Sequence, residues 1–195
     1  MDPYLERLQE GIRSATHGMS AEDLQRHPEG KWSAAEVLEH LYLTYDGTVK
    51  AFERCLREDK PLARSPLLKD RMRTLVVTGL GYLPEGRKAP ERTQPRGMRP
   101  DEVMREIGPR ISAMDDLITQ CEARFGKRTR VLDHPILGPL TACQWRKFHW
   151  VHGRHHLKQI QQLRQQNSRD GTRTNDGTTT NDGGRTSRPA DLPGK

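Results

Sequence analysis

The sequence is poor in cysteine and contains no long apolar run. The chain has 195 residues and three cysteines, Cys55, Cys121 and Cys143, which lie far apart and leave one unpaired in any scheme, so the pattern argues against a disulfide framework. No segment approaches the roughly 18 consecutive apolar residues of a membrane span. The charged start of the chain lacks the apolar core of a signal peptide. These absences predict a cytoplasmic protein with no membrane partner.

Acidic residues are outnumbered by basic ones. The chain has 33 Lys and Arg against 26 Asp and Glu, a formal net charge of +7. A basic excess raises the question of nucleic-acid binding. However, the basic residues interleave with acids, as in Glu6-Arg7 and Glu53-Arg54. We find no basic-aromatic repeat and no recognition helix. The charge pattern therefore favours solvated helix faces and predicts no nucleic-acid partner.

Apolar residues nearly disappear toward the end of the chain. From Asn167 onward only Ala190 and Leu192 could enter a core. Such a segment cannot offset its ordering entropy by burying apolar surface. We therefore expect one folded domain over 1–166 and a disordered, low-complexity tail over 167–195.

Four segments have the apolar spacing of amphipathic helices. They are expected at about 3–17, 33–57, 101–124 and 141–163. Ser33 with Glu36, and Thr141 with Gln144, form capping boxes that predict the starts of the second and fourth helices. Pro109 lies inside the third helix and predicts a kink or break there, because proline removes a backbone donor.

The stretch from 60 to 100 joins the second and third predicted helices. Its first half, 65–80, is spaced for a further helix, whereas its second half carries four prolines and predicts an extended coil. The strand signal is weak, limited to short apolar pairs near 131–137. The pattern predicts an all-α four-helix bundle with one long crossover between helices 2 and 3.

Histidine is concentrated in the last predicted helix, at His149, His152, His155 and His156. Residues four apart lie on the same helix face, so His152 and His156 can both reach one metal ion. Imidazoles are polar and need partners when buried, and a metal satisfies several at once. The alternative interpretation is an exposed basic or pH-sensitive patch.

His40 is the best-placed third ligand elsewhere in the domain. It lies at the edge of the apolar stripe of the second helix, and the small residues Gly47 and Ala51 on the same side leave room beside it. The alternative role for His40 is a hydrogen-bonded core residue. Three neutral imidazoles suit zinc, nickel, copper or iron(II), with zinc and nickel preferred here. Three protein ligands leave a coordination position open, as in catalytic sites.

Two segments resemble a known superfamily. The segments KWSAAEVLEHL (31–41) and FHWVHGRHHLKQI (148–160) are similar to paired signatures of the DinB-like superfamily, including the YfiT-like metal-dependent hydrolases. The resemblance covers most of 1–166 and implies a four-helix bundle with a long crossover. It also implies a metal held by His40, His152 and His156. Characterised relatives include thiol S-transferases and a thiol-dependent isomerase.

The resemblance favours a metal-dependent enzyme acting on a small-molecule substrate, either a thiol S-transferase or a hydrolase. A low-molecular-weight thiol cofactor needs cations for its acidic groups, and the crossover offers Arg87, Lys88, Arg92 and Arg96. The alternative for these cations is a solvated loop. For hydrolysis we find no convincing general base. Glu36 belongs to a helix cap, and Glu39 could equally face solvent instead of the site.

A second functional hypothesis is a non-catalytic metal- or ligand-binding bundle with a stress-related role, which could form a homodimer. The roles of His134, His149 and His155 stay open at this point. His134 precedes the last helix and either packs there or lines the mouth of the site.

Overall fold

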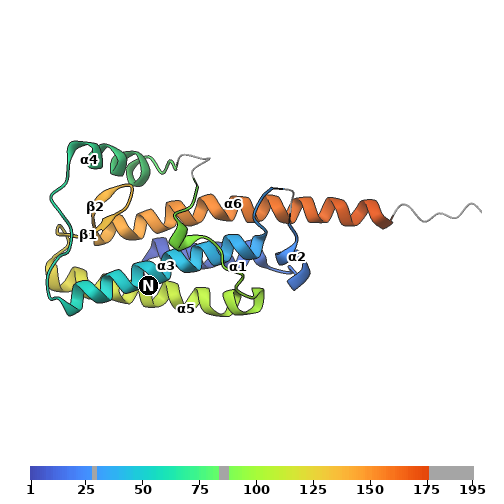
Figure 1. Cartoon of the computed structure of the whole chain (residues 1–195), viewed down its shortest axis with the longest axis horizontal. Coiled ribbons are helices and arrows are strands. Elements are labelled where there is room, and N and C mark those ends of the chain that lie inside the picture. Colours follow the sequence, from blue (N-terminus) through green and yellow to red (C-terminus); the bar gives the residue numbers. More distant parts are fainter. Residues whose placement is uncertain (28–29, 84–87, 176–195) are drawn as a thin grey trace, which may run out of the picture.

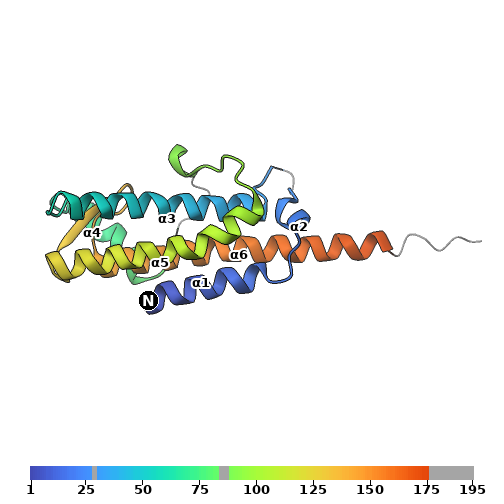
Figure 2. The ribbon, with the colours of Figure 1, turned by 90° about the horizontal axis from the view of Figure 1, so that it is seen from below.

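The computed structural model describes residues 1–27, 30–83 and 88–175, and this part of the chain is mostly helical (Figure 1). Its longest helices are α1 (Pro3–Thr16), α3 (Ala34–Arg57), α5 (Pro100–Phe125) and α6 (Ala142–Asn175). Helix α3 packs along α5, α1 packs along α6, and α3 also contacts α6. Figure 2 shows these long helices running beside one another. The predominance of helix confirms the all-α expectation in its coarse form.

Both predicted capping boxes are present. Ser33 Oγ accepts the backbone N–H of Glu36 at 3.2 Å, and the Glu36 carboxylate accepts the N–H of Ser33 at 2.8 Å. Thr141 and Gln144 make the matching pair at 3.0 and 3.3 Å. These bonds satisfy backbone donors that a helix start otherwise leaves unpaired. They fix where α3 and α6 begin, and therefore the phase of each histidine-bearing face.

Three expectations about the helices need correction. Helix α5 continues through Pro109 without a break. Helix α6 extends to Asn175, beyond the expected end near 163. That extension includes the start of the predicted tail, and the rest of the tail, 176–195, lies outside the described residues. A short helix that we did not expect, α2 (Ala21–Gln25), precedes α3.

The weak strand signal near 131–137 corresponds to two short strands, so the all-α prediction needs correction there. Strands β1 (Arg130–His134) and β2 (Gly138–Thr141) form an antiparallel hairpin with a register irregularity after Arg130. Short alternating segments gain their stability from tertiary packing, which the local pattern does not reveal. Here Val131, Leu132 and Leu140 are buried in the core that α3 and α6 share.

The crossover between α3 and α5 contains more structure than a coil. The helix expected over 65–80 appears as α4 (Leu68–Thr74) followed by a π-helical turn, η1 (Leu75–Gly79). A 3-10 turn, η2 (Glu91–Thr93), interrupts the proline-rich half. Thr74 Oγ1 donates to the Leu137 carbonyl of the hairpin at 3.3 Å. The crossover is thus attached to the hairpin at one end.

A buried arginine connects α5 to α6. Arg146 is 6% exposed and donates to Asp115 at 2.8 Å, to Glu122 at 2.7 Å and to Thr119 at 2.7 Å. Asp115 also accepts the backbone N–H of Asp2 at 2.7 Å. Buried charges are tolerated when they are paired and fully hydrogen-bonded. This network therefore sets how α6 lies against α5 and the chain's first residues.

The contact between α1 and α6 depends on a glycine. A Cβ added at Gly153 would overlap the side chain of Leu8, which is fully buried. We expect Gly153→Ala to lower the free energy of unfolding by about 1–3 kcal/mol through overpacking, measured by urea denaturation. The matched control is Gly47→Ala, where an added Cβ meets nothing within 4 Å in the exposed interior of α3. That variant should gain about 0.5–1 kcal/mol; equal effects of the two substitutions would contradict the packing argument.

Candidate metal centre

Helix α3 presents His40 toward α6. The side chain is 4% exposed, and its Nδ1 donates to the backbone carbonyl of Thr93 in η2 at 2.8 Å. Because a carbonyl only accepts, Nδ1 carries the proton and Nε2 keeps its lone pair. The ring is thus oriented by the crossover, with its free nitrogen directed at α6.

Helix α6 presents the other two predicted ligands, one turn apart. His156 is 8% exposed, and its Nδ1 lies 2.8 Å from Oε1 of Gln159. That contact again places the proton on Nδ1 and the lone pair on Nε2. His152 is partly buried and stacks on the ring of Phe148, with centroids 5.5 Å apart.

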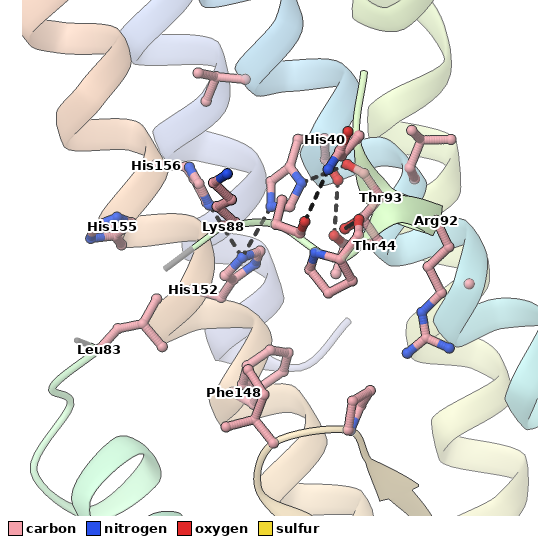
Figure 3. A pocket seen from close by; sticks show the side chains of 18 of the residues that line it. His40, Thr44, Leu83, Lys88, Arg92, Thr93, Phe148, His152, His155 and His156 are labelled. Atoms are coloured by element: carbon pink, nitrogen blue, oxygen red, sulfur yellow. Dashed lines mark hydrogen bonds between the residues drawn. The ribbon is translucent and has the colours of Figure 1, made fainter. Parts of the chain in front are cut away.

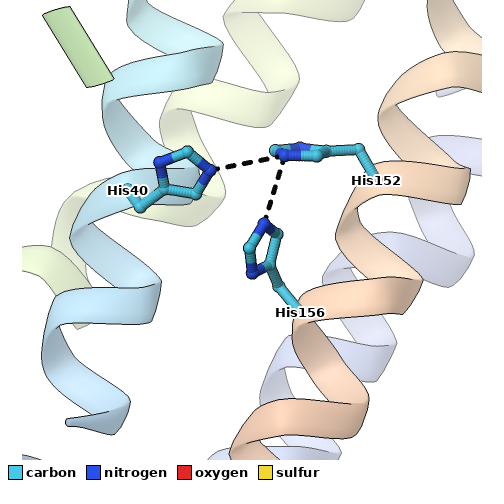
Figure 4. Close-up of side chains that lie close together, drawn as sticks. All are labelled: His40, His152 and His156. Carbon is cyan, nitrogen blue, oxygen red and sulfur yellow. Dashed lines mark hydrogen bonds between the residues drawn. The ribbon is translucent and has the colours of Figure 1, made fainter. Parts of the chain in front are cut away.

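The three Nε2 atoms converge (Figure 4). His152 Nε2 lies 3.3 Å from that of His40 and 3.2 Å from that of His156. One ligand atom from each of the three residues lies within 4.8 Å of the others. Tetrahedral coordination at a metal–nitrogen distance of about 2.0–2.1 Å separates two ligand nitrogens by about 3.3 Å. The sequence prediction placed these three residues together, and the structure brings them together with two of the three Nε2 separations close to that value.

The hydrogen bonding also suits a cation. His40 and His156 each direct a lone pair at His152, because their Nδ1 protons are used elsewhere. A metal ion accepts all three lone pairs, whereas a single imidazole N–H satisfies one. His152 Nδ1 is buried without a hydrogen-bond partner among the described residues. The donor set is therefore that of a neutral three-imidazole site, with two of its rings oriented by further hydrogen bonds.

Burial keeps these imidazoles uncharged. Desolvation lowers the pKa of His156 to about 3, with His40 as a further cause, and it lowers the pKa of His152 well below the usual value. Burial also lowers the pKa of His40, against the raising effect of the Thr93 carbonyl. Only neutral imidazole binds a metal. Protons therefore compete weakly with a metal at this site near neutral pH.

The residue before His40 has a role that sequence reasoning missed. Glu39 is 3% exposed, and its carboxylate accepts the backbone N–H groups of Arg96, Gly97 and Met98 at 2.7, 3.1 and 3.0 Å. The solvent-facing alternative for Glu39 is wrong, because these amides replace its hydration. The sequence did offer one signal for this role: Glu39 directly precedes a candidate ligand on a helix turn that was expected to be buried. Glu39 and His40 together hold the crossover over the histidines.

Three further histidines whose roles the sequence left open, His134, His149 and His155, are not among the converging ligands. His149 is fully buried, with Nε2 3.2 Å from Thr48 Oγ1. His155 Nε2 lies 3.3 Å from the Gln159 amide nitrogen. His134 accepts two backbone N–H groups on Nδ1, from Ile136 and Leu137. These three residues pack around the centre, and His134 and His155 also line its cavity.

A cavity of about 1320 Å³ opens beside the three histidines. Three of the four predicted cofactor-binding cations line it: Lys88, Arg92 and Arg96. The fourth, Arg87, lies outside the described residues. Figure 3 shows that Arg92 points away from His152 and His156. Gly47 and Ala51 line the same cavity, as their small size suggested.

Comparison with known proteins places the chain in a family. The family described as "Protein of unknown function (DUF1569)" matches residues 5–163, most of the chain, and the chain belongs to it. No curated protein and no solved structure matches the chain. The matched range contains all three converging histidines. None of the helices among the described residues is long and apolar enough to cross a membrane.

The three-histidine centre predicts a defined stoichiometry. Purified without a His tag, the chain should bind one Ni²⁺ or Zn²⁺ per molecule in isothermal titration calorimetry. We expect His152→Ala to weaken this binding at least 100-fold, because two imidazoles remain and the converging geometry is lost.

The matched control is His155→Ala, one residue from His156 on the same helix but outside the converging set. It should bind the metal within about threefold of wild type. Equal loss in both variants would show that the metal binds to a diffuse histidine patch.

Acid should destabilise the metal-free protein in a defined pH window. Burial lowers the pKa of His149 to about 3, so the folded chain leaves it neutral while the unfolded chain protonates it below about 6.5. The unfolded state then binds more protons, so this contribution to stability is complete above pH 6.5 and is lost as the pH falls toward 3. One such proton gives a slope of about 1.4 kcal/mol per pH unit.

The slope can be measured by urea denaturation between pH 6.5 and 4.5. His149→Gln removes one of the groups that titrate, so the slope should decrease by about 1.4 kcal/mol per pH unit. An unchanged slope would mean that the buried His149 does not contribute.

Proposed function

We propose that this member of the DUF1569 family is a metal-dependent enzyme that transfers a small thiol to an electrophilic substrate. Its centre would be a zinc or nickel ion held by His40, His152 and His156. We further propose that α1, α3, α5 and α6 form a four-helix bundle with a long crossover, as in the DinB-like superfamily that the two signatures resemble. A cytoplasmic location and a homodimer stay predictions.

The observation that carries the proposal is the charge balance of the cavity. The three imidazoles are neutral, so a bound divalent ion keeps its full charge, and Lys88, Arg92 and Arg96 add three more cations to the lining. Two acids are among the described residues that line the cavity: Asp46 pairs with Lys50 at 2.7 Å and with Arg110 at 3.4 Å, and Asp133 accepts the backbone N–H of Arg64 at 3.3 Å. The site therefore favours an anionic ligand. A thiolate attached to carboxylates or phosphates has this chemistry.

Thiol transfer suits the residues better than hydrolysis does. A metal bound here would lower the pKa of a thiol and hold it as the thiolate. Hydrolysis also needs a base to accept a proton from water, and the two glutamates near His40 in sequence are committed elsewhere. Glu36 caps α3, and Glu39 accepts three backbone amides. Hydrolysis is thus the less favoured reaction, because neither glutamate near His40 is free to act as the base.

The chain's own groups supply binding and orientation. Thr93 and Gln159 orient two of the ligand rings through their Nδ1 protons. Lys88 lines the same cavity as the histidines, where it can contact an acidic group of the thiol. The ring of Phe148 covers one face of His152 and excludes water from that side.

The alternative function is a metal- or ligand-binding protein without catalysis. It is supported by the lack of a general base near the centre among the described residues. Turnover distinguishes the two functions, since both require the metal.

The proposal predicts thiol transfer that depends on metal. The metal-loaded protein should conjugate one of glutathione, bacillithiol or mycothiol to 1-chloro-2,4-dinitrobenzene. The absorbance of the conjugate measures the rate. Chelation and His152→Ala should each reduce the rate at least 100-fold. Lys88→Ala should raise the KM for the thiol about tenfold with little change in kcat, because one charge-assisted contact to the thiol is lost.

The matched control is Lys50→Ala, a cation that lines the same cavity but pairs with Asp46. Its KM should stay within about twofold of wild type. Metal binding without turnover for any of the three thiols would favour the non-catalytic alternative.

A further inference from the structure

One wall of the cavity is largely apolar. It is formed by residues of α4, η1 and the hairpin turn: Met72, Val76, Val77, Ile136 and Leu137. Figure 3 shows Leu83 and Phe148 on the side of His152 away from His156. The cavity lining thus combines these apolar side chains with cations, one of which, Arg73, lies on α4 next to Met72.

The apolar wall is exposed at Met72 and Ile136, whereas Val77 and Leu137 are buried. Met72 is 58% exposed and Ile136 is 39% exposed. A contiguous exposed apolar surface on a protein commonly marks a binding site. Because these side chains line the same cavity as the three histidines, one ligand can contact both the apolar wall and the metal centre.

The backbone holds this wall in place. The π-helical turn η1 closes with the N–H of Leu80 bonded to the carbonyl of Leu75 at 3.1 Å, and Arg154 of α6 donates to the carbonyl of Gly81 at 2.9 Å. Arg73 donates to the carbonyl of Ile136 at 3.3 Å, joining α4 to the hairpin turn. Single π-helical turns are frequent at functional sites. The apolar wall is thus fixed to α6, which carries two of the ligands.

The volume allows two ligands together. Sites for a single small molecule usually measure about 300–1,000 Å³, and this cavity is about 1320 Å³. A thiol bound by the cations leaves the apolar wall for a second compound.

We propose that this apolar wall, formed by Met72, Val76 and Ile136 with Leu137, binds the apolar group of the acceptor, so that the enzyme selects electrophiles carrying an alkyl or aryl chain. This inference rests on the proposed thiol transfer for its reaction. The thiolate sulfur forms a bond to the electrophilic carbon, a leaving group such as a halide departs with the bonding electron pair, and the thiol's proton passes to solvent. During this step the alkyl or aryl group of the acceptor lies along α4 and the hairpin.

Binding can be measured without turnover. Butanoate, hexanoate, octanoate and decanoate present an anionic head to the metal and cations and a tail of increasing length to the apolar wall. Calorimetry on the zinc-loaded protein should show the affinity rising about fourfold per added methylene while the tail is being buried. An affinity independent of chain length would overturn the proposal.

Paired variants show where the hydrocarbon tail of the carboxylate binds. Met72→Ser and Ile136→Ser should each weaken octanoate binding about tenfold and leave butanoate within twofold. Leu68→Ser is the matched control, because Leu68 is 76% exposed on α4 and does not line the cavity. Its octanoate affinity should equal that of wild type, and a loss matching that of Met72→Ser would overturn the proposal in favour of unspecific binding to exposed apolar surface.

A kinetic series separates this inference from the proposed function. With the active thiol, 1-iodoalkanes from ethyl to hexyl should show kcat/KM rising with chain length, and Met72→Ser should flatten that rise. Flat kinetics with intact turnover would overturn the acceptor site alone. An absence of turnover, together with the expected carboxylate series, would overturn thiol transfer and support the apolar site.

Discussion

The attachment of the crossover to two consecutive residues of α3 is the interaction on which the site depends. Glu39 accepts three backbone amides of the crossover, and His40 donates to the carbonyl of Thr93. A buried carboxylate without these donors would be strongly destabilised, and a histidine without that carbonyl would lose its defined tautomer. One helix turn thus orients a metal ligand and fixes the segment that carries the cations.

The attachment also explains why the crossover residues lie at the metal centre despite their distance in sequence. Thr93 follows His40 by 53 positions, so loop-closure entropy opposes the contact. Four hydrogen bonds, one buried and three partly buried to a charged group, offset that entropy. Because the bonds use backbone groups of the crossover, its side chains are left to face the cavity.

The sequence predicted features that are encoded locally. The capping boxes at Ser33 and Thr141 set the helix starts, and the four-residue spacing of His152 and His156 placed both rings on one face. Features that arise from contacts between distant segments were missed. The β1–β2 hairpin is stabilised by core packing. Glu39 resembles an ordinary surface residue in the sequence, because its partners are amides of the distant crossover. His40 needed the family resemblance, because a single histidine at a stripe edge has two equally ordinary roles.

In the proposed function, metal binding and ligand selection belong to different parts of this chain. The three ligands lie on α3 and α6, long helices fixed by capping boxes and by the buried Arg146 network. The cationic and apolar walls lie on the crossover and the hairpin. Substitutions in such connecting segments change which ligand fits without moving the ligand nitrogens. A fold resemblance can therefore support the metal centre while leaving the substrate undetermined, because the residues that choose the substrate belong to the segments between the helices.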